Sequence, residues 1–136
     1  RDIGVTGVQT CALPICSMTE RDEVGQFLKQ LKDKIAVFGV VFRYRDKNLA
    51  DLAEINITPS ARTNYLLQLS VEDYYSGPHK DTYDNNLPDY YEFGIVIKKR
   101  TIYIKISTGK PNKPVDCISF HIAEFTIRYP FKNKKI

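Results

Sequence analysis

The first element that the hydrophobic pattern predicts is an amphipathic helix. Apolar side chains recur three or four positions apart at Val24, Phe27, Leu28, Leu31 and Ile35. This spacing places them on one face of an α-helix. Thr19 stands just before the pattern and is followed by three acidic residues. Such a start is typical of a helix with a side-chain cap and favourable charges at its positive end.

The pattern changes several times before residue 90. The run AVFGVVFRY at 36–44 is rich in β-branched and aromatic residues and predicts a strand. Residues 48–55 and 58–69 each predict a helix. Residues 70–75 predict one more helical turn. Residues 76–89 contain Gly, two Pro and two Asn, and this composition predicts a loop.

Three later runs alternate between apolar and polar positions, as strands do. They lie at 90–98, 101–107 and 115–122 and are separated by segments of turn composition. Short connections favour antiparallel pairing between successive strands. We therefore predict an α+β fold, with helices at about 19–75 packed on an antiparallel sheet at about 90–130.

Alternation also predicts which side chains of these runs share a face. The apolar set is expected to face the helices and consists of Tyr91, Phe93, Ile95, Ile97, Ile102, Ile104, Ile106, Ile118, Phe120 and Ile122. The opposite face then gathers Glu92, Tyr103, Lys105, Ser119 and His121, with Cys117 beside them. The sequence thus predicts a sheet with one apolar and one polar face.

The polar set contains the residue types with which ribonucleases cleave RNA without a metal. A carboxylate or imidazole removes the proton of a ribose 2′-hydroxyl, a second acid protonates the leaving 5′-oxygen, and a cation stabilises the phosphorane. A tyrosine can stack on a base or contact a phosphate. An ordinary solvated sheet face has the same composition. The face pattern alone therefore leaves catalysis and a plain surface both open.

Charge is distributed unevenly along the chain. Residues 18–93 hold 9 Lys/Arg and 13 Asp/Glu, whereas residues 94–136 hold 10 Lys/Arg and 2 Asp/Glu. A basic segment of this kind suggests a polyanionic partner such as RNA. A surface that serves only solubility explains the charge equally well, so charge alone does not decide between them.

Cysteine and histidine usage favours a reduced protein without metal or cofactor. Cys117 is the single cysteine after residue 17, so no disulfide can form within 18–136. This is typical of a cytoplasmic protein. One cysteine with His79 and His121, at no ligand spacing, predicts no zinc site. No apolar run approaches the roughly 20 residues of a membrane span.

Residues 1–17 differ from the rest of the chain. The stretch VTGVQTCALPI at 5–15 resembles the in-frame translation of a sequencing-library adapter, and the single methionine, Met18, follows shortly after. A signal peptide is disfavoured because the stretch has one basic residue beside an acid and no long apolar run. We interpret 1–17 as an artefact or non-native extension and 18–136 as a single domain.

Four pieces in the second half of the chain occur in the order of one protein family: DYYSGP, YEFG, IYIKI and ISFHIAEFTIRYPF. With ITPSARTNYLLQLSVEDYY upstream, they resemble the MqsR family of type II toxin–antitoxin toxins over roughly residues 20–132. The resemblance implies a RelE-like fold, with N-terminal helices on an antiparallel sheet. It also implies an mRNA interferase, a metal-independent endoribonuclease that slows translation, and a cognate antitoxin as partner.

The resemblance carries over to individual residues unevenly. The tyrosine and lysine of the family's Y-x-K motif match Tyr103 and Lys105, and its active-site glutamine falls near Glu92. The lysine that follows D-F-Y in the founding member falls at Ser76, which departs from the pattern. Where the founding member reads S-F-K, this chain reads S-F-H, so His121 keeps a basic group at that position.

These observations lead to a hypothesis for the roles. Glu92 and His121 would act as general base and acid, Lys105 would stabilise the phosphorane, and Tyr103 would orient the phosphate or the base. Contacts to RNA are assigned to Lys80, Arg128, Lys132 and Tyr75. Lys80 is also a candidate to replace the lysine that is missing from the motif.

Three other functions remain open on the sequence. A non-catalytic RNA-binding sheet would leave RNA intact. A protein-interaction domain would show no salt-dependent retention of RNA, because it would make no phosphate contacts. A ribosome-dependent toxin would spare naked RNA and still arrest translation.

Overall fold

The computed structural model of this chain describes residues 19–43, 53–80 and 87–132. The segment 1–17, interpreted above as non-native, lies outside them. The elements in chain order are α1 (Glu20–Phe38), β1 (Val40–Phe42), α3 (Pro59–Leu67), the 3₁₀-helix η3 (Val71–Asp73), β2 (Tyr74–His79), β3 (Tyr90–Ile97), β4 (Arg100–Ser107) and β5 (Val115–Ile122). The strands form one five-stranded sheet in the order β1-β5-β4-β3-β2. The fold is therefore α+β, as predicted.

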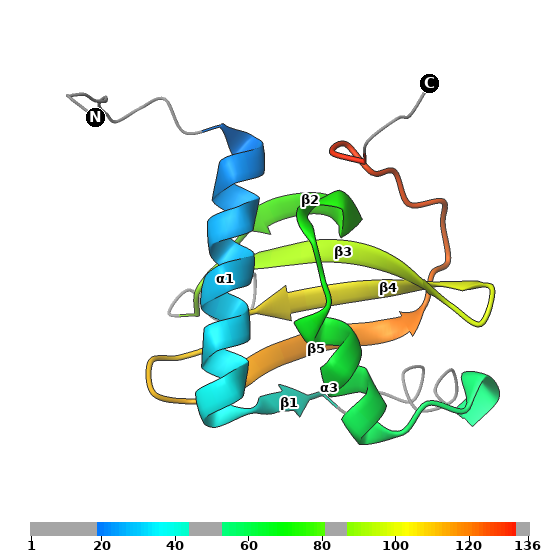
Figure 1. The fold of residues 1–136 in the computed structure, drawn as a ribbon, viewed down its shortest axis with the longest axis horizontal. Coiled ribbons are helices and arrows are strands. Elements are labelled where there is room, and N and C mark those ends of the chain that lie inside the picture. The colour runs from blue at the N-terminus through cyan, green and yellow to red at the C-terminus, as the bar shows by residue number, and fades with distance from the viewer. Residues whose placement is uncertain (1–18, 44–52, 81–86, 133–136) are drawn as a thin grey trace.

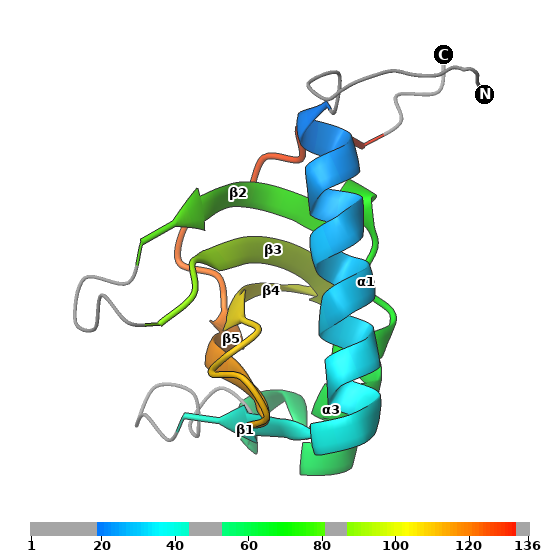
Figure 2. The ribbon, with the colours of Figure 1, turned by 90° about the vertical axis from the view of Figure 1, so that its left-hand side faces the viewer.

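The two longer helices lie on the same side of the sheet. In Figure 1 both α1 and α3 stand in front of the strands, and Figure 2 shows from the side that both lie on one face. We call the face that they cover the inner face, and the opposite one the outer face. Within the described part of the chain, no helix covers the outer face.

The first helix forms where the apolar pattern predicted it. The Thr19 hydroxyl accepts a hydrogen bond from the Asp22 amide at 3.1 Å, and the Asp22 carboxylate accepts one from the Thr19 amide at 3.3 Å. This reciprocal cap stabilises a helix start by about 0.5–2 kcal/mol. Gly39 ends the helix at a φ of 79°, a conformation that glycine adopts without strain. The predicted apolar stripe is buried throughout.

The inner face carries the hydrophobic core. Phe93, Ile104 and Phe120 stand opposite one another on three neighbouring strands. All three side chains are almost completely buried, as are Leu31 of α1 and Leu66 of α3, which pack in the same cluster. Burying one such side chain contributes about 1.5–3 kcal/mol. The predicted apolar sets of β3 and β4 are thus confirmed as core or as packed against it.

The sheet is mixed, whereas the sequence predicted an antiparallel one. β1 pairs in parallel with β5, with Val40 opposite Val115 and Phe42 opposite Cys117. The run at 36–44 gives only this short strand, because α1 continues to Phe38 before Gly39 ends it. The partner of β1 lies some 75 residues later in the chain. A local pattern does not report such a distant pairing.

The strand β2 was missed. Ser70 and Asp73 form the expected reciprocal cap, but it closes only η3, and Tyr74 then begins a strand instead of a helical turn. The Tyr74 side chain is buried in the core, and its hydroxyl donates to the Gly77 carbonyl at 2.5 Å. The prediction of a loop at 76–89 is therefore wrong for 76–79. Its positions 81–86, like 48–52 of a predicted helix, lie outside the described residues.

β5 departs from strict alternation. Ile106 lies opposite Cys117, yet the preceding Lys105 lies opposite Ser119, so Ile118 is an extra residue in the strand. Such a bulge changes which face the following side chains occupy. Cys117 therefore lies in the core at 1% exposure, and its predicted place on the polar face is wrong.

The sheet also ends earlier than predicted. β5 stops at Ile122, and residues 123–132, which we call the C-terminal segment, continue without strand structure. This segment crosses the outer face at Gly94. A Cβ atom at that position would lie 2.6 Å from Ile127 Cδ1 and 2.9 Å from the Tyr129 hydroxyl. The absence of a side chain at Gly94 is what lets the C-terminal segment lie directly on the sheet.

Candidate active site on the outer face

Strand register brings the predicted polar residues together. Glu92 lies opposite Lys105, and Lys105 lies opposite Ser119. In the neighbouring row, Tyr103 lies opposite His121. Directly opposite residues of paired strands share a face. The prediction that these five side chains gather on the outer face is therefore confirmed.

The Glu92 carboxylate is the centre of this group. One of its oxygens, Oε2, accepts a short hydrogen bond from the Tyr103 hydroxyl. The other, Oε1, lies 3.1 Å from Nε2 of His79. The Glu92 side chain is 16% exposed, so Tyr103 and His79 contact it while part of it remains open to solvent. An ionised carboxylate has about four acceptor positions, so it can still accept a hydrogen bond from a third group.

His79 is the residue that the sequence analysis missed. It was considered there only as a poor metal ligand within a loop, whereas β2 places it beside Glu92. Its Nε2 also lies 2.7 Å from the Ser76 hydroxyl. Ser76 is the position at which the MqsR resemblance leads one to expect a lysine. The β-favouring pair Tyr74-Tyr75 was the available signal that a strand begins before His79.

Tyr103 is a hydrogen-bond donor at neutral pH. Burial raises the pKa of its phenol well above the ordinary value, and the hydrogen bond to Glu92 and the charge of Glu92 raise it further. The hydroxyl therefore keeps its proton at neutral pH. Tyr103 can orient Glu92, but it does not serve as a general base.

His121 stands on the other side of Tyr103, at 5.3 Å between ring centroids. Its Nδ1 lies 2.9 Å from the Ile122 carbonyl oxygen. Because a carbonyl only accepts, this contact places a hydrogen on Nδ1 and leaves Nε2 as the atom able to exchange a proton. His121 is buried, at 9% exposure, whereas the His79 side chain is 41% exposed. His79 is thus the more accessible imidazole.

Lys105 supplies the positive charge of this group. Its Nζ lies 4.3 Å from the centroid of the Tyr90 ring, and the ring of His79 lies 5.3 Å from the same centroid. Lys105 and His79 thus both contact the Tyr90 ring. A cation, an imidazole and a carboxylate are close together on the half of the outer face that the C-terminal segment does not cross.

The residues predicted to bind RNA are spread more widely. Tyr75 reaches the site, because its ring lies 5.5 Å from Phe125, which in turn lies 5.6 Å from Tyr103. Lys80 is exposed directly after β2, next to His79. Arg128 and Lys132 are exposed on the C-terminal segment. Lys132 contacts Tyr129, with 5.1 Å from Nζ to the ring centroid, and no described contact joins it to the Glu92 carboxylate.

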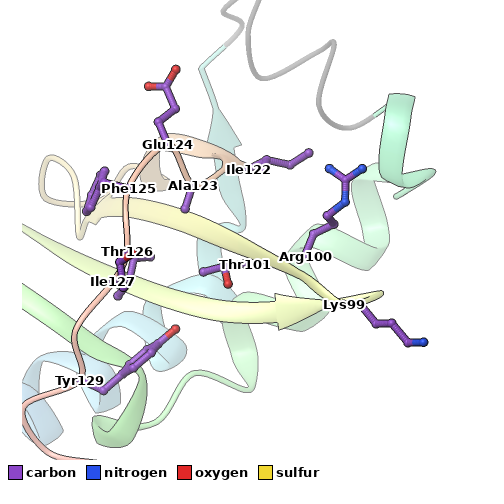
Figure 3. Close-up of a pocket in the computed structure, with 10 residues that line it drawn as sticks. All are labelled: Lys99, Arg100, Thr101, Ile122, Ala123, Glu124, Phe125, Thr126, Ile127 and Tyr129. Carbon is purple, nitrogen blue, oxygen red and sulfur yellow. The ribbon is translucent and has the colours of Figure 1, made fainter.

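A groove of about 500 Å³ adjoins this site. It is lined by residues 99–101 at the start of β4, and by residues 122–127 and Tyr129 at the end of β5 and along the C-terminal segment. Figure 3 shows Thr101 in the middle of this groove, with Phe125 and Tyr129 on one side and Lys99 and Arg100 on the other. Glu92 does not line the groove.

Within residues 19–43, 53–80 and 87–132, no group of three or more His, Cys, Asp or Glu side chains is arranged to hold a metal ion. No helix in these ranges is long and apolar enough to cross a membrane. Comparison with protein-family models, with curated proteins and with solved structures finds no match to this chain. The resemblance to the MqsR family therefore stays a prediction.

Proposed function

We propose that this protein is a metal-independent endoribonuclease that cleaves messenger RNA. In this proposal it is the toxin of a type II toxin–antitoxin pair, with a RelE-like fold and a cytoplasmic site of action. The observation that supports it most is the Glu92 carboxylate, held between the Tyr103 hydroxyl and the His79 imidazole on the outer face. Lys105 on the neighbouring strand adds the cation that phosphoryl chemistry needs.

The reaction would need one base and one acid. Glu92 would take the proton of the ribose 2′-hydroxyl, and the 2′-oxygen would attack the adjacent phosphorus. The bond from phosphorus to the 5′-oxygen would break, and an imidazolium would donate its proton to that oxygen. The products are a 2′,3′-cyclic phosphate and a free 5′-hydroxyl, and no metal takes part in either step.

Two histidines can fill the role of the acid. The sequence favoured His121, whereas the geometry favours His79, because its imidazole contacts Glu92 directly and is far more exposed. His121 would then support the ring of Tyr103 from the other side. The charge on the phosphorane would be stabilised by Lys105.

The remaining contacts would bind the RNA chain. Tyr75 and Phe125 offer ring faces to unstacked bases. Lys80, next to His79, would contact a phosphate near the reacting bond, and Arg128 and Lys132 would contact phosphates further along the C-terminal segment. A cognate antitoxin is proposed as partner on the strength of the resemblance.

The test uses the full chain, naked single-stranded RNA and excess chelator. The proposal predicts short products that end in a 2′,3′-cyclic phosphate. His79→Ala is expected to lower the cleavage rate by about 100-fold or more, as loss of a general acid does, and His121→Ala by less. A larger loss of cleavage rate in His121→Ala than in His79→Ala would instead assign the role of general acid to His121.

Two outcomes would replace the proposal with one of its alternatives. Intact RNA that is nevertheless retained in a salt-dependent manner would indicate a non-catalytic RNA-binding sheet. Intact naked RNA combined with arrested translation in a cell-free system would indicate a toxin that acts only on the ribosome. Cleavage that chelator abolishes would contradict the metal-independent mechanism.

A further inference from the structure

The groove beside the candidate active site is formed by the C-terminal segment where it crosses the outer face of the sheet. After β5, residues 123–129 turn back across the outer face instead of ending at the sheet edge. Gly94 allows this crossing, because any Cβ there would collide with Ile127. Ile127 is buried against the sheet, whereas the neighbouring Phe125 is 46% exposed. Ile127 thus holds the segment on the sheet, whereas Phe125 exposes part of its ring to solvent.

The two sides of the groove differ in chemistry (Figure 3). One side carries the rings of Phe125 and Tyr129, and the other carries the cations Lys99 and Arg100, with the Thr101 hydroxyl between them. Arg100 pairs with Glu54 at 2.5 Å, in a contact exposed on both partners. Lys99 is exposed and forms no ion pair with any described residue. An aromatic ring and an exposed lysine that line the same groove suit a nucleotide, which has a flat base and a charged phosphate.

The groove lies close to the Glu92 centre. Thr101 precedes Tyr103 by two residues on the same strand and the same face, which is about 7 Å. Phe125 lines the groove and also lies 5.6 Å from the Tyr103 ring. The buried row of Gly94, Tyr103 and His121 separates Glu92 from Thr101, so an RNA strand that contacts both would pass over Phe125 of the C-terminal segment.

We propose that this groove binds a nucleotide of single-stranded RNA next to the one that is cleaved. The base stacks on Phe125, and the phosphate is bound by Lys99. This inference rests on the proposed function for the identity of the ligand, but it concerns binding and not the chemical step. The volume of about 500 Å³ falls within the usual range of ligand sites, roughly 300–1,000 Å³.

The experiment measures binding without cleavage. The probe is a fluorescently labelled single-stranded 2′-deoxy oligonucleotide, which lacks the attacking hydroxyl, and its anisotropy is followed at several salt concentrations. Phe125→Ala is compared with Phe38→Ala, which removes a ring of similar exposure, 41%, at the end of α1. Lys99→Ala is compared with Lys29→Ala, which removes an exposed cation from α1. The unfolding free energy of each variant is measured in parallel.

Phe125→Ala is expected to weaken binding by about fivefold or more, the effect of losing one stacked base. Lys99→Ala is expected to reduce the slope of log affinity against log salt by about 0.7, which corresponds to one phosphate contact on a single strand. Neither control variant should change affinity. In a cleavage assay, Phe125→Ala should raise KM by the same factor.

Failure of the groove and failure of the proposed function give different results. If the wild-type protein cleaves RNA, but Phe125→Ala and Lys99→Ala bind the oligonucleotide like their controls, the groove proposal is overturned and the endoribonuclease stands. If wild type does not cleave, but binding depends on Phe125 and Lys99, the groove stands without the catalytic proposal. Absence of binding by wild type at low salt overturns the groove proposal.

Discussion

The inner and outer faces of the sheet use the same strands for two different tasks. On β3, Phe93 faces inward and is fully buried, while Glu92, one residue earlier, faces outward and bonds to other polar groups. On β4, Ile104 and Lys105 divide in the same way. Because side chains alternate along a strand, a change on one face need not disturb the other. Stability and chemistry can therefore be tested separately by mutating neighbouring residues.

The largest effect on stability is expected on the inner face. Phe93→Ala should lower the free energy of unfolding by about 3–5 kcal/mol, because it leaves a cavity in the core. Lys105→Ala, on the outer face, should change it by about 0.5 kcal/mol or less. Urea denaturation of both variants measures the difference. Equal losses of unfolding free energy in the two variants would show that stability does not depend more on the inner face than on the outer face.

At high pH, the free energy of unfolding should change mainly through tyrosines that burial keeps protonated. Burial, and then the charge and hydrogen bond of Glu20, raise the pKa of Tyr74 to about 12 from the ordinary value of 10.0. Between these values the unfolded chain has lost a proton that the folded protein keeps. The free energy of unfolding should therefore fall as pH rises from 10 to about 12, by up to about 1.4 kcal/mol per pH unit for this residue.

The Tyr74 effect is isolated by comparing Tyr74→Phe with wild type in urea at pH 10 and pH 11.5. The variant should lose less stability than wild type over this interval, because it lacks one of the titrating groups. Identical losses would mean that Tyr74 ionises normally and is not held in the core.

The smallest expected effect is the alkylation of Cys117 in the native protein, because its thiol lies on the inner face. Burial raises its pKa well above the ordinary value, and the charge of Asp116 raises it further. Only the thiolate reacts with alkylating agents. Iodoacetamide at pH 8 should leave Cys117 unmodified in the native protein and modify it once urea unfolds the chain, as peptide mass spectrometry of that residue would show. Rapid alkylation of the native protein would place Cys117 on the outer face instead.

The faces of β3 and β4 could be predicted from sequence because nothing interrupts their alternation. Tyr90 to Ile97 pair residue by residue with Arg100 to Ser107, so a period of two assigns each side chain correctly. The same rule failed in β5, where the extra residue Ile118 moved Cys117 into the core. A bulge is a property of the pairing between two strands, and the apolar pattern of one strand does not report it.

The candidate site was predicted where it depends on regular strands and missed where it depends on β2. Glu92, Lys105 and Tyr103 follow from alternation and register alone. His79 follows Gly77 and Pro78, which are typical of loops, so its strand conformation depends on pairing with Tyr90 of β3. The groove was also missed, because it requires the C-terminal segment to cross the sheet at Gly94.

The central claim is that the outer face carries the chemistry and that Glu92 is its base. The most direct test is the single-turnover cleavage rate of Glu92→Gln and wild type on the same naked RNA with excess chelator. The unfolding free energy is measured on the same samples. We predict a rate at least about 100-fold lower and a stability within about 1 kcal/mol of wild type. Equal cleavage rates in the two proteins would contradict the claim.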